Sequence, residues 1–326
     1  MTGLSVTQES WSVRGSFTIS RGTRTHAEVV VCALSREGRV GRGECLPYPR
    51  YGESVEGVVA EIEGLRDELA RGLDREALQA RLPAGAARNG LDCAFWDLEA
   101  KSAGKRVWDL AGIPAPEPTV TAFTLSLDTP EKMAAAAADN ADRPLLKLKL
   151  AGAEDLERVR AVRASAPDSR LVIDANEGWS VEDYRTLAPQ LAELGVALIE
   201  QPLPAGEDEG LRGLDRPVPL CADESCHDRR SLPGLLGLYD VINIKLDKTG
   251  GLTEALALKA AAQDAGLGIM VGCMLTTSLA MAPAMLLTAG AVVVDLDGPL
   301  LLAGDRENGL VYEGSVVHPP STALWG

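Results

Sequence analysis

From about residue 119 onward, short apolar runs alternate with longer amphipathic stretches. The apolar runs have the length of strands, and the stretches between them, such as 131–141, 154–166, 181–195 and 252–266, repeat apolar residues at helical spacing. Eight strands are predicted at 119–127, 145–150, 170–175, 196–201, 218–223, 240–246, 268–273 and 291–296. Strands that alternate with helices form a parallel sheet, so we expect a (β/α)7β TIM-like barrel over residues 116–303. Ser180 precedes two acidic residues and is expected to cap the helix that follows it.

The first part of the chain has a different pattern. Two antiparallel strands are expected at 16–22 and 26–35, joined by RGTRT at 21–25, and residues 38–54 are rich in Gly and Pro and are expected to form a loop. Helical patterns follow over 55–73, 74–82 and 85–104. These elements predict an α+β domain over residues 1–115, bounded by a Pro-rich linker, and we expect residues 304–326 to pack back on it.

Composition restricts the functions to consider. Of the 326 residues, 46% are hydrophobic and the net charge is −15, which argues against nucleic acid as the main partner. The longest apolar stretch, near 279–294, is interrupted by Pro283 and Gly290, so no membrane span is expected. The N-terminus does not resemble a signal peptide, and the six cysteines show no paired spacing. We therefore expect a cytoplasmic protein with reduced cysteines; homo-oligomerisation is left open.

Five charged residues follow five consecutive apolar runs at intervals of 22 to 26 residues: Lys149, Asp174, Glu200, Asp223 and Lys245. In a (β/α)8 barrel the C-terminal ends of the strands converge on one site, so the five side chains should meet. Three carboxylates without a neighbouring His or Cys favour a hard divalent cation, Mg²⁺ or Mn²⁺.

The two lysines would then face the pocket from opposite strands. A cation that stabilises an enediolate, with one lysine removing the α-proton and the other returning it to the opposite face, makes a racemase or epimerase. Lys147 would lower the pKa of Lys149 through its positive charge. A single acid at a strand end is more often a helix cap or a surface group, but five such residues in this order favour catalysis.

The same residues lie in motifs that resemble the enolase superfamily, muconate-lactonising subgroup. The motifs are KLK (147–149), DANEGW (174–179), EQP (200–202), ADES (222–225) and NIKLDKTGG (243–251), and the resemblance covers essentially the whole chain. It implies that Lys149 and Lys245 are the acid/base pair. It also implies that Asp174, Glu200 and Asp223 bind the metal, and that the N-terminal domain caps the barrel.

Within this family the sequence is most similar to the dipeptide epimerases. This similarity implies that Asp295 and Asp297 bind the α-ammonium of a dipeptide and that Arg24 binds an acidic side chain of the substrate. Further residues expected to line the substrate pocket are Thr124, Lys147, Cys273 and Met274. The implied reaction is epimerisation of the C-terminal residue of L-Ala-D/L-Glu, a peptide of peptidoglycan turnover.

Three alternatives stay open at this point. The first is a dipeptide epimerase of another specificity, which Arg24 would discriminate. The second is an o-succinylbenzoate synthase or cycloisomerase of the same superfamily, against which the Asp295/Asp297 pair argues. The third is a non-catalytic scaffold, against which the intact lysines and acids argue.

Overall fold

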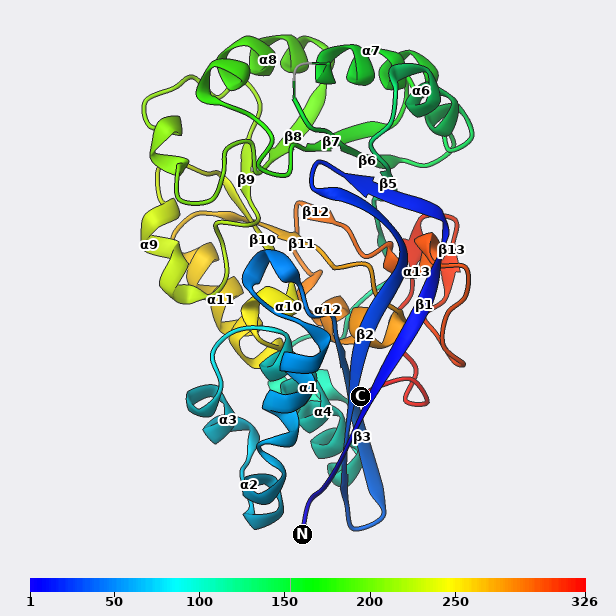
Figure 1. Ribbon diagram of the computed structural model, residues 1–326, viewed down its shortest axis with the longest axis vertical. Coiled ribbons are helices and arrows are strands. Elements are labelled where there is room, and N and C mark those ends of the chain that lie inside the picture. The colour runs from blue at the N-terminus through cyan, green and yellow to red at the C-terminus, as the bar shows by residue number, and fades with distance from the viewer. Residues whose placement is uncertain (153) are drawn as a thin grey trace.

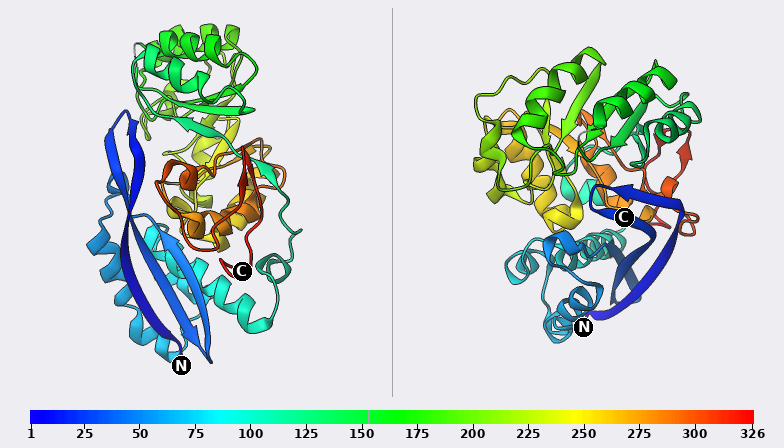
Figure 2. Two further views of the ribbon diagram at one scale, coloured as in Figure 1. Left: turned by 90° about the vertical axis from the view of Figure 1, so that its right-hand side faces the viewer. Right: turned by 45° about the horizontal axis from the view of Figure 1, so that its top comes forward.

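The structure, a computed structural model, describes residues 1–152 and 154–326. An elongated N-terminal domain lies below a larger α/β domain, and a long hairpin of the first domain reaches up to the second (Figures 1 and 2).

The N-terminal domain consists of an antiparallel sheet with helices packed on one side of it. The sheet has the order β1-β2-β3, with β1 at Gly3–Ile19, β2 at Gly22–Arg36 and β3 at Arg39–Cys45. The helices are η1 (Pro49–Tyr51), α1 (Val55–Glu63), α2 (Arg66–Arg71), α3 (Arg75–Arg81), α4 (Ala86–Ala103) and α5 (Val107–Ala111).

The two predicted N-terminal strands exist but are longer than expected. The turn between them consists of Ser20 and Arg21, and Gly22 to Thr25 already belong to β2. Arg24 therefore lies on a strand, paired with Phe17, and not in a loop.

The prediction of a loop over 38–54 is wrong for its first half, which is strand β3. The glycines of this segment have a packing role. A Cβ at Gly43 would lie 2.1 Å from the carbonyl oxygen of Gly90, and one at Gly41 would lie 2.3 Å from that of Ala94. Helix α4 therefore packs directly on the backbone of β3, which only glycine permits.

The α/β domain is built on a curled sheet of eight parallel strands in the order β12-β11-β10-β9-β8-β7-β6-β5. The strands are β5 (Phe123–Leu125), β6 (Leu145–Lys149), β7 (Arg170–Asp174), β8 (Val196–Glu200), β9 (Leu220–Ala222), β10 (Val241–Ile244), β11 (Gly268–Val271) and β12 (Val293–Val294). Each lies within one of the predicted ranges. At the two edges of the sheet, the Ala122 N–H donates to the carbonyl of Val294 at 2.8 Å.

The connections between these strands carry the helices. They are α6 (Pro130–Ala138), α7 (Asp155–Ser165), α8 (Val181–Glu193), η2 (Asp208–Leu211), η3 (Arg229–Ser231), α9 (Leu232–Leu235), α10 (Leu246–Thr249), α11 (Leu252–Asp264), α12 (Ser278–Ala284), η4 (Met285–Leu287) and α13 (Gly298–Leu301). The predicted cap of α8 is confirmed, because the Ser180 hydroxyl accepts the N–H of Asp183 at 3.1 Å.

The first predicted strand, 119–127, is divided in two. Its start, β4 (Thr119–Val120), pairs with β14 (Val316–Val317) in a small sheet that also holds β13 (Tyr312–Glu313). The last residues of the chain contact the N-terminal domain: the Trp325 indole donates to the carbonyl of Cys93, and the Gly326 N–H donates to Asp97.

Candidate active site

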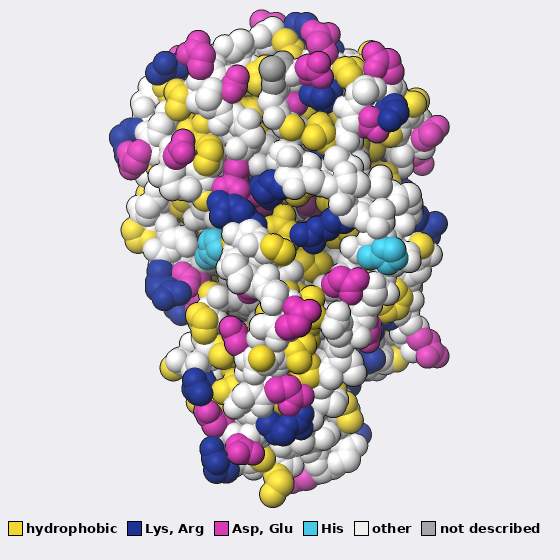
Figure 3. All heavy atoms as spheres, viewed as in Figure 1, with side chains coloured by type: hydrophobic (Ala, Val, Ile, Leu, Met, Phe, Trp, Pro, Cys, Tyr) yellow, Lys and Arg dark blue, Asp and Glu magenta, His cyan; other side chains and the backbone are white. Residues whose placement is uncertain are grey.

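The C-terminal ends of seven of the eight strands, all but β8, and the tip of the β1–β2 hairpin line one cavity of about 760 Å³, including its open mouth. Figure 3 shows basic side chains gathered around a hollow near the middle of this face. The cavity is lined by all seven residues that the sequence assigns to the substrate, Arg24, Thr124, Lys147, Cys273, Met274, Asp295 and Asp297, and by Lys149, Asp223 and Lys245.

Strand register brings the predicted acids side by side. In the sheet Lys149 pairs with Asp174, and Asp174 pairs with Glu200, so the three lie at one level. Asp223 directly follows β9. Three carboxylate oxygens, one each from Asp174, Glu200 and Asp223, lie within 4.8 Å of one another. All three side chains are buried.

This arrangement fits a hard cation. Three converging carboxylates at such distances are the donor set that Mg²⁺ uses, because this ion prefers oxygen ligands. Lysines balance the charge: Lys149 Nζ lies 2.6 Å from Asp174, Lys245 Nζ lies 2.6 Å from Asp223, and Lys147 Nζ lies 2.7 Å from Glu200.

The ion pairs set the protonation of the acids. Burial alone would raise the pKa of Asp174, but Lys149 and Lys147 lower it to about 2. Burial also opposes ionisation of Asp223, yet Lys245 and Lys248 hold the pKa of this carboxyl well below its usual range. Glu200 differs, because burial and the charge of Asp174 raise its pKa to about 8.

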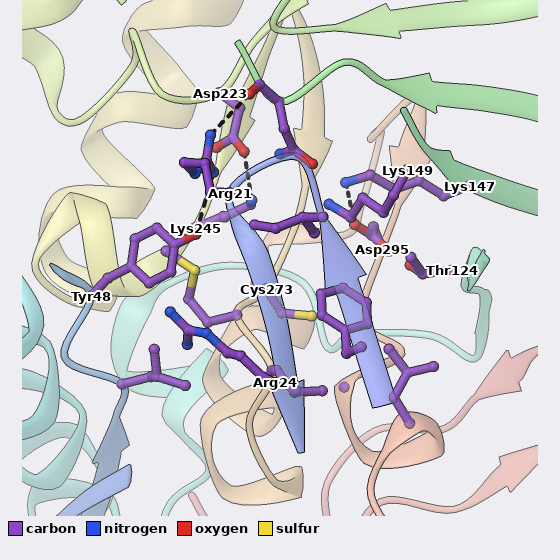
Figure 4. Close-up of a pocket in the computed structure, with 18 of the residues that line it drawn as sticks. Arg21, Arg24, Tyr48, Thr124, Lys147, Lys149, Asp223, Lys245, Cys273 and Asp295 are labelled. Atoms are coloured by element: carbon purple, nitrogen blue, oxygen red, sulfur yellow. Dashed lines mark hydrogen bonds and ion pairs between the residues drawn. The ribbon is translucent and has the colours of Figure 1, made fainter. Parts of the chain in front are cut away.

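The two candidate bases come from well-separated strands. Lys149 ends β6 and Lys245 directly follows β10, four strands further along the sheet, and each pairs with a different acid. Figure 4 shows Lys149 and Lys147 on one side of the cavity and Lys245 beside Asp223 on the other. Burial opposes the charge of Lys245, but Asp223 and Glu200 outweigh it and hold its pKa well above its usual value.

A second acidic pair lies at the end of β12. Asp295 accepts a hydrogen bond from Lys147 at 2.8 Å, and its Oδ1 is buried without a hydrogen bond from any described residue. Asp297 accepts the N–H of Thr124 at 2.6 Å. Burial and then the charge of Asp295 raise the pKa of Asp297 to about 7.

Arg24 reaches the cavity from the hairpin. Its guanidinium lies 5.0 Å from the ring centre of Tyr48, within the range of a cation–π contact. It forms no ion pair with any described residue, so it is free to receive an anion.

Some lining residues were not expected from the sequence. Arg21, Tyr51, Asn176 and Glu224 also line the cavity. Three of them belong to motifs already noted, RGTRT, DANEGW and ADES. Tyr51 lies in the loop after β3, residues 46–54, which we call the second loop. Lys248 does not line the cavity, but its Nζ donates to two oxygens of Asp223, Oδ1 and the backbone carbonyl oxygen, each at 2.5 Å.

Two family descriptions match the chain in succession. Residues 1–112 match the "Mandelate racemase / muconate lactonizing enzyme, N-terminal domain", and residues 132–322 match "Enolase C-terminal domain-like". The chain belongs to the enolase superfamily. The resemblance inferred from the motifs is thereby confirmed.

Two relatives within the superfamily are similar over nearly their whole length. The L-Ala-D/L-Glu epimerase of Escherichia coli (strain K12) is 48% identical over 98% of this chain and 100% of its own. The N-acetyl-D-glutamate racemase of a Pseudoalteromonas species is 45% identical over 91% of this chain and 95% of its own.

Solved structures of superfamily members hold ligands. An enolase family member from Agrobacterium tumefaciens with homology to dipeptide epimerases, with bound sodium and L-Ala-L-Glu, is 57% identical, superposes with a TM-score of 0.98 and covers 100% of both chains. A dipeptide epimerase from Enterococcus faecalis, complexed with Mg and L-Leu-L-Tyr, is 29% identical over 97% of this chain and 96% of its own, with a TM-score of 0.90.

None of the helices in the described part of the chain has the length and hydrophobicity needed to cross a membrane.

Proposed function

We propose that this protein is a magnesium-dependent isomerase that inverts the α-carbon of the C-terminal residue of L-Ala-D/L-Glu. The observation that carries this proposal is the pair of buried lysines, Lys149 and Lys245, which flank one carboxylate triad from separate strands. The 48% identity to an L-Ala-D/L-Glu epimerase gives the substrate class.

Asp174, Glu200 and Asp223 would hold the cation. When bound, a divalent cation supplies positive charge beside the substrate carboxylate, where negative charge develops as the α-proton leaves. The oxygen-only donor set favours Mg²⁺, and Mn²⁺ accepts similar ligands.

The lysines would divide the proton transfer. Lys149 would exchange a proton with one face of the α-carbon and Lys245 with the other. A lysine base needs a pKa near the working pH, whereas the carboxylates hold that of Lys245 well above it. A cation on the triad would compete with Lys149 and Lys245 for their carboxylate partners and so favour the neutral amines.

Asp295, Asp297 and Arg24 would hold the two ends of the dipeptide. Lys147 contacts Asp295 as well as Glu200, whereas Asp297 has no ion-pair partner among the described residues, so Asp297 would supply the carboxylate that an α-ammonium requires. Arg24, without an acidic partner among the described residues, would bind the side-chain carboxylate of glutamate. Thr124, Cys273 and Met274 would line the space between them.

A second candidate is racemisation of an N-acylated glutamate. The relative with that name is 45% identical, and its substrate would present the same glutamate carboxylate to Arg24. With a pKa of about 7, Asp297 is partly protonated at neutral pH, and its protonated form could donate a hydrogen bond to an acyl oxygen. We rank it second, because two acids at this end of the cavity suit an ammonium better.

One experiment separates the candidates. The protein is incubated in D₂O with Mg²⁺ and, in parallel, with chelator, and each substrate is analysed for deuterium at the α-carbon by mass spectrometry. The panel holds L-Ala-L-Glu, L-Ala-L-Leu and N-acetyl-L-glutamate. We expect metal-dependent exchange that is fastest with L-Ala-L-Glu. Faster exchange with N-acetyl-L-glutamate would reverse the ranking, and no exchange with any substrate would contradict the proposed function.

The proposal extends to the architecture. We infer a closed barrel over 116–303, supported by the Ala122–Val294 hydrogen bond. The capping domain would comprise 1–115 together with 304–326, supported by the contacts of the last residues with α4. Cytoplasmic location, and action on peptides of peptidoglycan turnover, belong to this proposal as well.

A further inference from the structure

The turn after β7 connects a predicted metal ligand to the hairpin tip. Asn176 and Glu177 have φ values of 45° and 65°. These values lie in the left-handed region, which residues other than glycine rarely adopt. This conformation lets the Asn176 N–H donate to Asp174 at 2.9 Å, while the Asn176 carbonyl accepts from Ser20 (3.1 Å) and Arg21 (3.0 Å). Strained backbone of this kind persists where surrounding contacts impose it.

The side chain of Glu177 contacts two separate loops of the N-terminal domain. Its carboxylate lies 3.1 Å from Arg21 of the hairpin tip, and it accepts hydrogen bonds from Arg50 of the second loop at 2.8 and 2.6 Å. A fourth hydrogen bond, from the Ala205 N–H at 2.8 Å, fixes the carboxylate to the α/β domain. The Glu177 side chain is 9% exposed, whereas those of Arg21 and Arg50 are 27% and 38% exposed, so these ion pairs are partly exposed to solvent.

Both loops form walls of the substrate cavity. The hairpin contributes Phe17, Ile19 and Arg24, and the second loop contributes Tyr48 and Tyr51. Glu177 itself does not line the cavity. Opening either loop would widen the mouth of the cavity and expose the substrate to water.

We propose that Glu177 is a positioning residue that holds both loops closed over the cavity through Arg21 and Arg50. The proposal deepens the proposed function, on which its kinetic consequence rests. Loss of the Glu177 charge should loosen both loops, because one carboxylate contacts both arginines, but the hairpin less than the second loop, because Arg21 also forms a 2.7 Å ion pair with Glu224. Through the loops, it should weaken substrate retention more than it slows proton transfer.

Glu177→Gln tests this proposal, since Gln keeps one oxygen for the Ala205 N–H but loses the charge and the second oxygen, which accepts from Arg21 and from Arg50 Nε. Hydrogen exchange of the Mg²⁺-loaded protein, followed by mass spectrometry, reports the opening of peptides that cover 17–25 and 48–54. We expect exchange to accelerate by up to about fivefold over 48–54, the upper range for a partly exposed ion pair, and by less over 17–25, where Arg21 keeps its ion pair with Glu224. Peptides of the sheet, such as those covering 241–244, should not change.

Glu254→Gln is the matched control. Glu254 accepts two hydrogen bonds from the Arg229 side chain, at 2.9 and 2.8 Å, and one from its N–H, but neither residue lines the substrate cavity. This variant should leave both loop peptides unchanged. Acceleration in only one loop of Glu177→Gln, or in neither, would overturn the proposal. If Glu177→Gln does not fold, Arg50→Met, which removes the contacts of the second loop to Glu177, must accelerate exchange over 48–54, and no acceleration there would overturn the proposal.

Kinetics with L-Ala-L-Glu supply the second measurement. The KM of Glu177→Gln should rise about fivefold with kcat changed less, whereas a purely structural defect would lower the melting temperature without this split. An unchanged KM despite open loops would overturn the retention role. If the wild-type protein does not turn over L-Ala-L-Glu, the proposed function fails, and the exchange measurement still decides whether Glu177 closes the loops.

Discussion

At the scale of single residues, charge placement decides the chemistry of the cavity. The five charged residues at strand ends could be predicted from the sequence, because the length of one strand plus one helix places successive strand ends at regular intervals. The structure brings them together as expected. Their roles in binding and proton transfer stay proposals.

Other residues of the cavity could not be predicted in this way. Arg21 contacts Glu177 across 156 positions of sequence, and Glu177 contacts Arg50 across 127. Local spacing carries no information on such contacts, since they depend on how the hairpin lies on the α/β domain. The DANEGW motif indicates an unusual turn, but it does not indicate which residues the turn contacts.

The raised pKa of Asp297 predicts a pH dependence for substrate binding. An ammonium needs the ionised carboxylate, so kcat/KM for L-Ala-L-Glu should fall as the pH drops through about 7. N-acetyl-L-glutamate has no ammonium, so its profile should lack this fall.

The measurement is kcat/KM for both compounds between about pH 6 and 8. Asp297→Asn serves as the control, because an amide cannot titrate, and it should remove the difference between the two profiles. Identical profiles in the wild-type protein would contradict ammonium binding by Asp297.

At the scale of elements, strand and helix periodicity identified the eight strands of the large sheet and the cap at Ser180. It failed at β3, where the glycines of GRVGRGE suggested a loop. Glycine serves turns and close backbone packing alike, and the sequence alone does not separate the two uses.

The packing of α4 on β3 yields a stability prediction. Gly43→Ala places a methyl group 2.1 Å from the Gly90 carbonyl, so the helix or the strand must shift. We expect the free energy of unfolding to fall by roughly 1–3 kcal/mol, as in other overpacked cores. Urea unfolding followed by circular dichroism measures it.

Gly234→Ala is the control, because a Cβ at Gly234 meets no atom within 4 Å and its φ is not in the left-handed region. Equal effects of the two substitutions would show that β3 and α4 are not in close contact.

At the scale of the whole molecule, buried polar contacts join the two domains. Asp247, on α10 of the α/β domain, accepts the Leu46 N–H and the Asn89 amide, both on Oδ1 at 2.9 Å. Arg88 of α4 donates to the carbonyls of Thr249 and Gly250. A single hydrophobic cluster also includes residues of both domains, such as Trp96 and Leu146.

The burial of Asp247 opposes folding at neutral pH. Burial raises the pKa of this carboxyl from 3.8 to about 7, so the folded state binds more protons than the unfolded state between these values. Below about pH 4 the carboxyl is protonated in both states and does not oppose folding. As the pH rises to about 7, the buried carboxyl lowers the free energy of unfolding by up to about 4 kcal/mol.

Asp247→Asn tests this point, since the amide oxygen can accept both hydrogen bonds without a charge. The variant should be more stable than the wild type at pH 7, and the advantage should shrink toward pH 4. Unfolding free energies of both proteins across this range give the comparison. An advantage that does not depend on pH would contradict the linkage.

The central claim is that Lys149 and Lys245 serve opposite faces of one α-carbon. Lys149→Ala and Lys245→Ala are incubated separately with L-Ala-L-Glu and L-Ala-D-Glu in D₂O, and epimer composition and α-deuterium are measured. Each variant should fail to interconvert the epimers, and each should retain α-proton exchange with one epimer only, a different one for each variant. Interconversion at the wild-type rate by either variant, or retained exchange with the same epimer by both, would contradict the two-lysine mechanism.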